Sequence, residues 1–143
     1  MQQKTSLGIF RALAGFVCIY HLLLGLVGTF ASSATVISVV ERAYGVTLTA
    51  NDQLTFLTRF ASAYMLVFAV AVGMLAANPL KYRNLVWLPV TLFAVRIVER
   101  LALFGSLNET FGVSAASNLQ VIIPITVLCV SLVAFRPRGN KTA

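Results

Sequence analysis

The chain has 143 residues, of which 59% are hydrophobic and only 10% are charged, whereas soluble domains carry about 25% charged residues. This length allows one domain at most, and the net charge of +7 does not indicate nucleic-acid binding, because the basic residues are dispersed among apolar segments. An all-α integral membrane protein, with its basic residues mostly in the loops of one side, explains both the hydropathy and the charge.

The first predicted element is a membrane-spanning helix over residues 7–30, interrupted only by Arg11 and His21. At about 1.5 Å per residue, such a helix can cross about 30 Å of hydrocarbon. A cleaved signal peptide is the alternative, but its apolar region would be only about 7–15 residues long, and Arg11 interrupts this run.

One face of this first helix carries small residues together with its histidine. Small residues allow transmembrane helices to pack closely, so this face is predicted to point into a bundle. Its members are Ala14, Cys18, His21, Gly25 and Gly28, and the opposite face, predicted to contact lipid, carries Phe16, Ile19, Leu23 and Leu26.

Residues 31–53 form the one sizeable predicted loop. Within it, residues 35–44 are predicted to form a short helix lying at the membrane interface, with Ser33 as its N-cap and Gly45 as its C-cap.

Three further spans are predicted over residues 54–77, 85–107 and 119–135. The second and third are joined by a tight basic turn around Pro79, so they are expected to be antiparallel neighbours. Residues 108–118 are predicted to be a short loop, and Pro124 is predicted to bend the last span. The expected architecture is therefore a four-helix transmembrane bundle with a short interfacial helix after the first span.

The loop charges alternate between the two predicted sides of the membrane. One side collects six basic residues, and the positive-inside rule places that side, with both termini, in the cytoplasm. These residues are Lys4, Lys81, Arg83, Arg136, Arg138 and Lys141. A bacterial inner membrane is the expected location.

A charged cluster is predicted inside the membrane. Arg96, Glu99 and Arg100 stand at i, i+3 and i+4 of the third span, so a helix places them on one face, while Arg59 and His21 lie at overlapping depths in other spans. Charges at the bilayer centre cost at least about 2.5–3.5 kcal/mol each, so this face is expected to avoid lipid.

Three interpretations of this cluster stay open. The side chains could hold the bundle together, with Glu99 as the counter-ion of an arginine and His21 bonded to Glu99 or Tyr64. They could line a pocket for a lipid, a quinone-like molecule or a carboxylate, or His21 and Glu99 could relay protons.

Cofactor and catalytic motifs are not indicated. Cys18 and Cys129 have neither CxxC spacing nor a histidine at ligand spacing, so we interpret them as packing residues and predict no metal site. A haem or chlorophyll held by His21 would need a further partner, because the chain has one histidine. The sequence also lacks a phosphate loop, a nucleophile elbow and paired carboxylates, which disfavours ATPases, hydrolases and metalloenzymes.

The arrangement of the arginines resembles the DoxX-like and DUF4345-like small bacterial membrane proteins. The resemblance rests on an arginine near the outer start of the second span (Thr58-Arg59-Phe60) and on Arg96 and Arg100 in the third. It implies a four-helix membrane bundle, with some DoxX-type members linked to redox or respiratory complexes, and it implies no catalytic residues.

The expected function is that of a binding or accessory subunit. Its cationic pocket would hold a lipid- or quinone-like ligand, or the chain would dock on a larger membrane complex or on a second copy of itself. The alternatives are a small membrane enzyme, such as an isomerase or oxidoreductase with Glu99 or His21 as acid or base, and a proton-coupled transporter.

Overall fold

The computed structural model describes residues 2–49 and 51–137, and within these ranges every regular element is helical. The elements are α1 (Gln2–Phe30), α2 (Ser33–Tyr44), α3 (Asp52–Ala77), the 3-10 helix η1 (Arg83–Val86), α4 (Trp87–Ala102), α5 (Phe104–Phe111) and α6 (Ala115–Ala134). The prediction of an all-α fold is confirmed.

Within the described ranges, three helices, α1, α3 and α6, are long and apolar enough to cross a membrane. The third predicted span is shorter than expected, because α4 has only 16 residues, which is about 24 Å at the α-helical rise. The structure therefore supports a helical membrane protein, whereas a closed four-helix bundle and the bacterial inner membrane stay predictions.

Helices α1 and α3 form the tightest pair in the fold. Where Gly28 faces α3, a Cβ atom would overlap the side chain of Ser62, and at Gly25 it would come within 2.7 Å of the Leu66 side chain. The Cys18 thiol also donates a hydrogen bond of 3.2 Å to the Ala69 carbonyl. The small-residue face predicted for α1 is thus the face that packs on its neighbour, and the opposite, predicted lipid-facing side is exposed.

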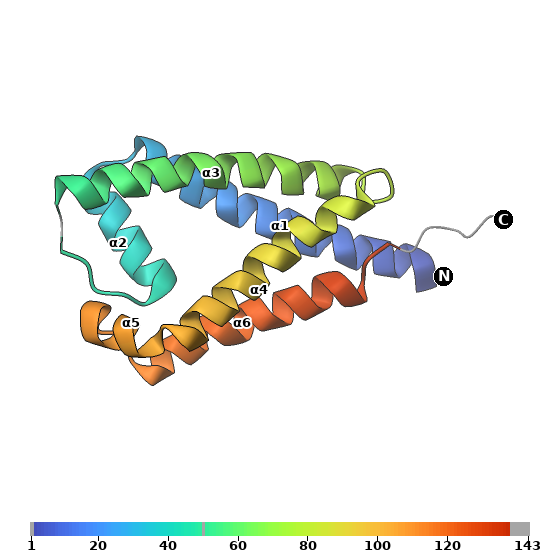
Figure 1. Cartoon of the computed structure of the whole chain (residues 1–143). Helices are drawn as coiled ribbons and strands as arrows, with labels where there is room; N and C mark the ends of the chain where they lie inside the picture. The colour runs from blue at the N-terminus through green and yellow to red at the C-terminus, as the bar shows by residue number, and fades with distance from the viewer. Residues whose placement is uncertain (1, 50, 138–143) are drawn as a thin grey trace.

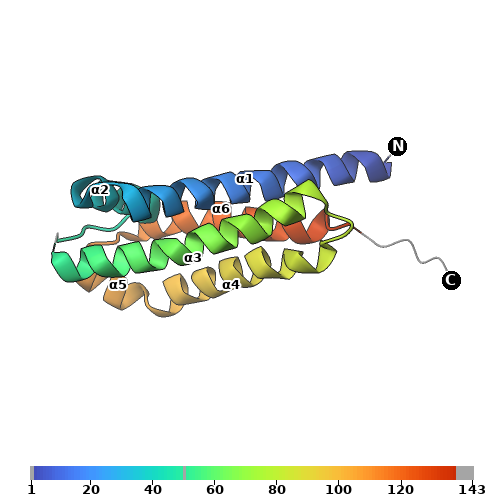
Figure 2. The same ribbon diagram turned by 90° about the horizontal axis from the view of Figure 1, so that it is seen from above.

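The hydrophobic core lies toward one end of the molecule. Figure 1 shows two helix pairs, α1 with α3 and α4 with α6, which approach each other near the α3–η1 turn and diverge toward α2 and α5. Figure 2 shows that α1, α3, α4 and α6 run in roughly the same direction when the fold is seen from above. The buried core cluster is drawn from α1, α3, η1, α4 and α6, and includes Phe10, Val17, Val72, Leu75, Val86, Phe93 and Leu132.

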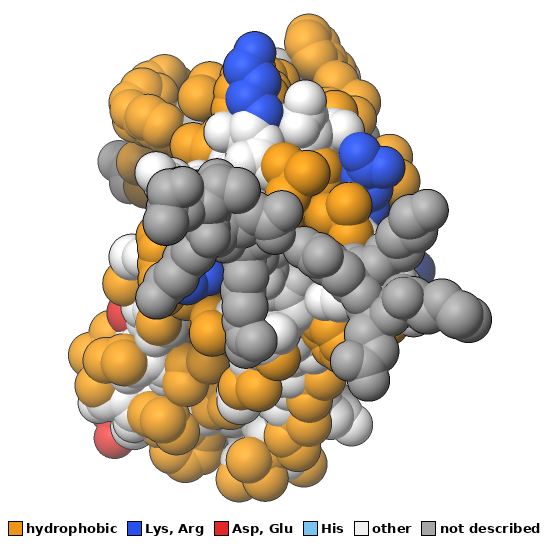
Figure 3. Space-filling model, turned by 90° about the vertical axis from the view of Figure 1, so that its right-hand side faces the viewer, with side chains coloured by type: hydrophobic (Ala, Val, Ile, Leu, Met, Phe, Trp, Pro, Cys, Tyr) orange, Lys and Arg blue, Asp and Glu red, His pale blue; other side chains and the backbone are white. Residues whose placement is uncertain are grey.

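The convergent end carries basic side chains. It contains the first turns of α1, the α3–η1 turn and the last turn of α6, and Figure 3 shows Lys and Arg side chains there among hydrophobic ones. Arg11 links two of these elements by donating a hydrogen bond of 3.3 Å to the carbonyl of Ala77.

Helix α2 forms where a short helix was predicted, but its start differs. Ser32, not Ser33, is the N-cap, because the Ser32 hydroxyl accepts the backbone N–H of Thr35. The predicted C-cap at Gly45 is confirmed: its φ of 65° is left-handed, and its N–H bonds the Glu41 carbonyl. The Glu41 carboxylate accepts the N–H of Leu48 at 3.0 Å, which fixes the following segment.

The region after residue 102 was predicted incorrectly. The third span was expected to continue to residue 107, but α4 ends at Ala102, and α5 begins at Phe104 after the non-helical backbone of Leu103. The predicted loop over 108–118 is instead the second half of α5, a short turn and the start of α6. Asn108 stabilises the turn by donating a hydrogen bond of 3.0 Å to the Val113 carbonyl.

Candidate functional site

The divergence of the two helix pairs leaves a cleft of about 880 Å³. Residues of α1 and α3 line one side, residues of α4 and α6 line the other, and parts of α2 and α5 close its end. Most of the lining is apolar, including Phe16, Val40, Leu54, Phe93, Leu107, Phe111, Val121 and Leu128. Phe16, predicted to contact lipid, also borders this cleft.

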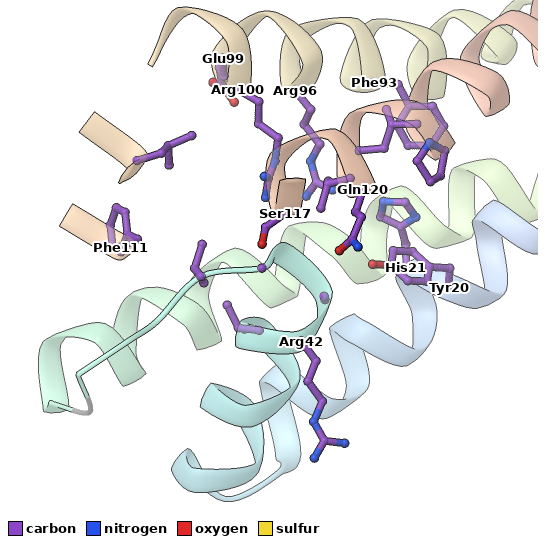
Figure 4. Close-up of a pocket in the computed structure, with 18 of the residues that line it drawn as sticks. Tyr20, His21, Arg42, Phe93, Arg96, Glu99, Arg100, Phe111, Ser117 and Gln120 are labelled. Carbon is purple, nitrogen blue, oxygen red and sulfur yellow. The ribbon is translucent and has the colours of Figure 1, made fainter. Parts of the chain in front are cut away.

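Two arginines of α4 form the cationic wall of the cleft. Figure 4 shows the side chains of Arg96 and Arg100, one helical turn apart, extending from α4 toward α2. Glu99 also lines the cleft, but its side chain is exposed and its carboxylate stays beside α4, away from the two guanidinium groups. The i, i+3, i+4 pattern therefore correctly placed the three residues on one side of the helix.

Asn118 of α6 fixes the position of Arg100. Its side-chain oxygen accepts a hydrogen bond of 3.1 Å from Arg100 Nη1, and its side-chain nitrogen donates one of 3.3 Å to the Arg100 carbonyl. Asn118 is only 6% exposed. These two bonds connect α6 to α4 directly beside the cleft.

His21 lies on the opposite side of the cleft, on α1, and is only 2% exposed. Its Nδ1 is 2.8 Å from the Val17 carbonyl oxygen, while its Nε2 is buried without a hydrogen-bond partner in the described part of the chain. The ring is packed against Phe68, with centroids 4.6 Å apart, and lies 6.2 Å from Phe93. The prediction that His21 points inward is confirmed, but its partner is neither Glu99 nor Tyr64.

Two other arginines behave differently from Arg96 and Arg100. Arg59 has an exposed side chain on α3 and is not among the residues that line the cleft. Arg42 of α2 does line it, yet Figure 4 shows its guanidinium directed away from the α4 arginines. The structure thus brings together four of the five predicted cluster residues, His21, Arg96, Glu99 and Arg100, and leaves Arg59 outside.

Several polar residues of the site were not predicted. Ser117 and Gln120 of α6 line the cleft, as does Tyr20 of α1, and Asn118 bonds to Arg100. The sequence signal that would have placed them is the N-cap of α6. The Ser114 hydroxyl accepts the N–H of Ser117, so the helix begins before Ser117, Asn118 and Gln120 and includes all three.

No group of three or more potential metal-ligating side chains occurs among the described residues. Both cysteines are free, and they lie in separate helix contacts, Cys18 bonding to Ala69 and Cys129 to Val90.

Comparisons of the chain with protein-family models, with curated protein sequences and with solved structures found no match. The resemblance to DoxX-like proteins therefore stays a prediction, and the function has to be argued from the site itself.

Proposed function

We propose that this chain is a membrane-embedded binding protein whose cleft holds an amphipathic molecule with an acidic head group. The head group would bind Arg96 and Arg100, and the apolar part would occupy the space lined by residues such as Leu107, Val121 and Leu128. The cleft volume of about 880 Å³ falls within the range of about 300–1,000 Å³ that is common for ligand sites.

The observation that carries this proposal is the pair of guanidinium groups on the wall of a mostly apolar cleft. Guanidinium groups form short, often bidentate hydrogen bonds with carboxylates and phosphates. An acidic head group in the cleft would therefore form charge-assisted hydrogen bonds with these two side chains. Glu99 is directed away from them, so it does not occupy the place of such a ligand.

We also propose four passes through the membrane with the convergent end in the cytoplasm. η1 and α4 follow each other without a gap from Arg83 to Ala102, which gives about 30 Å at about 1.5 Å per residue, enough for a third pass. Lys81, Arg83 and Arg136 belong to the convergent end, which favours its cytoplasmic placement by the positive-inside rule. The cleft would then lie in the opposite half of the membrane.

The test uses native mass spectrometry and lipid extraction to detect an amphiphile bound to the purified protein. Variants of Arg96 and Arg100 are compared with a matched variant of an arginine outside the cleft. Arg96→Gln and Arg100→Gln should lose a co-purified or added anionic amphiphile, such as a long-chain fatty acid. Arg59→Gln removes an arginine outside the cleft and should retain it. The proposal fails if the wild-type protein binds no amphiphile, or if all three variants lose it equally.

A further inference from the structure

The buried nitrogen of His21 indicates a second requirement for the ligand that we have proposed for the cleft. A carbonyl oxygen can only accept a hydrogen bond, so the 2.8 Å contact with Val17 requires that Nδ1 carries the proton. In the neutral ring, Nε2 is then an acceptor with a free lone pair.

This acceptor has no partner among the described residues, although His21 is only 2% exposed. A buried polar atom without a hydrogen bond typically costs about 1–3 kcal/mol, so a ligand that supplies a donor would be favoured. Figure 4 shows the His21 ring directed from α1 into the space faced by Phe93, Arg96 and Gln120.

A metal ion or tetrapyrrole is a poor match for this nitrogen. The rings of Tyr20, Phe68 and Phe93 surround the imidazole, with centroids 5.3, 4.6 and 6.2 Å from it. A macrocycle centred on Nε2 would have to displace all three rings, whereas a hydroxyl group is far smaller and has to shift only the side chains directly over the buried Nε2 atom.

We propose that the cleft selects an anionic amphiphile that also carries a hydroxyl group, with its acidic group at Arg96 and Arg100 and its hydroxyl donating to His21 Nε2. This inference rests on the proposed function, and it narrows the ligand to hydroxy fatty acids or to lipids with a hydroxylated acidic head group. The apolar cleft walls would bind the hydrocarbon chain of either ligand. His21 would favour a hydroxylated ligand over an otherwise identical ligand without the hydroxyl group.

The experiment measures binding to the detergent-solubilised full chain by displacement of a fluorescent fatty acid. The probes are 2-hydroxy- and 3-hydroxytetradecanoate, their methoxy derivatives and tetradecanoate itself. Phosphatidylglycerol and phosphatidic acid in mixed micelles form a second, lipid arm, because only the phosphatidylglycerol head group carries alcohol hydroxyls. We expect at least one hydroxylated probe to bind about three- to tenfold more tightly than its unhydroxylated counterpart, as one net hydrogen bond allows.

Two variants assign this preference to His21. His21→Phe keeps an aromatic ring but removes Nε2, so it should abolish the preference while binding of tetradecanoate persists. His21→Gln places a carboxamide oxygen near the position of Nε2 and should restore part of the preference, which also covers the case in which His21→Phe does not fold.

The outcomes separate the inference from the proposed function. If hydroxylated and plain probes bind the wild-type protein equally, or if the preference survives in His21→Phe, the inference is wrong, while arginine-dependent binding still supports an anion-binding cleft. If no probe binds in a saturable way, the proposed function fails as well.

Discussion

Asn118 and Arg100 exchange two hydrogen bonds that join α6 to α4 beside the cleft, one through the guanidinium and one through the backbone carbonyl of Arg100. Asn118 is buried, and replacing it with alanine removes the carboxamide that makes both hydrogen bonds. A hydrogen bond to a charged group typically contributes about 1.5–3 kcal/mol to stability.

We therefore predict that Asn118→Ala lowers stability by about that amount and weakens binding of an anionic amphiphile, since Arg100 loses its fixed position. Thermal unfolding in detergent and fatty-acid displacement would measure the two effects. Asn84→Ala, at an exposed position of η1, is the control and should change neither quantity. Equal behaviour of the two variants would contradict the positioning role.

This contact also shows where sequence interpretation reaches its limit. Hydrophobic runs and small-residue periodicity predicted α1, α3 and the face that joins them, because these features act along a single helix. Asn118 was assigned to a loop, and the end of α4 was missed, because Leu103 lies in an apolar run and is neither proline nor glycine. The direction that the chain takes after Leu103 depends on tertiary packing.

Arg59 illustrates a related error. Its depth along α3 matched that of the other charges, but depth does not determine which way a side chain points. Thr58 and Ser62 lie on the side of α3 that faces the interior of the fold, and the residue next to Thr58 is rotated by about 100° from it. The inward-facing positions of Thr58 and Ser62 thus explain why Arg59 lies outside the cluster.

The close approach of α1 and α3 predicts a strong effect of adding one methyl group. Gly28→Ala would place its Cβ into the Ser62 side chain, and such overpacking typically costs about 1–3 kcal/mol. Gly15 of the same helix has open space around it, so Gly15→Ala should be neutral or slightly stabilising.

Thermal unfolding of the two variants in the same detergent would test this pair. A second change, Ser62→Gly, removes the overlapping side chain and should recover part of the stability lost in Gly28→Ala. If Gly28→Ala unfolds at the wild-type temperature, α1 and α3 do not approach as closely as described.

The end of α2 gives a third prediction. Gly45 has a φ of 65°, and a Cβ there would also contact the Ser117 side chain at 3.4 Å. Gly45→Ala should destabilise the C-terminal turn of α2 by about 1 kcal/mol, because L-residues other than glycine are disfavoured in this region.

Hydrogen exchange measured by mass spectrometry should detect this change as faster exchange in the peptides of α2 and of the segment that follows it. The matched control is Gly105→Ala in α5, where the added methyl group meets no atom within 4 Å apart from adjacent residues and the helix's own backbone, and φ is not positive. Unchanged exchange in α2 would mean that Gly45 is not required as the cap.

Glu99 gives the prediction that best separates the interpretations of the charged cluster. If Glu99 were the counter-ion that holds the arginines, or a proton-relay partner of His21, Glu99→Gln would unfold the protein or abolish its activity. The structure instead shows Glu99 as an exposed residue at the cleft, with its carboxylate directed away from the guanidinium groups of Arg96 and Arg100. We therefore expect Glu99→Gln to fold with wild-type stability.

Removing the negative charge of Glu99 should leave anion binding unchanged or make it up to a few times tighter, whereas Arg100→Gln should weaken anion binding. Fatty-acid displacement at low ionic strength would show this opposite response, and weaker binding in Glu99→Gln would instead assign the carboxylate a direct role in the site.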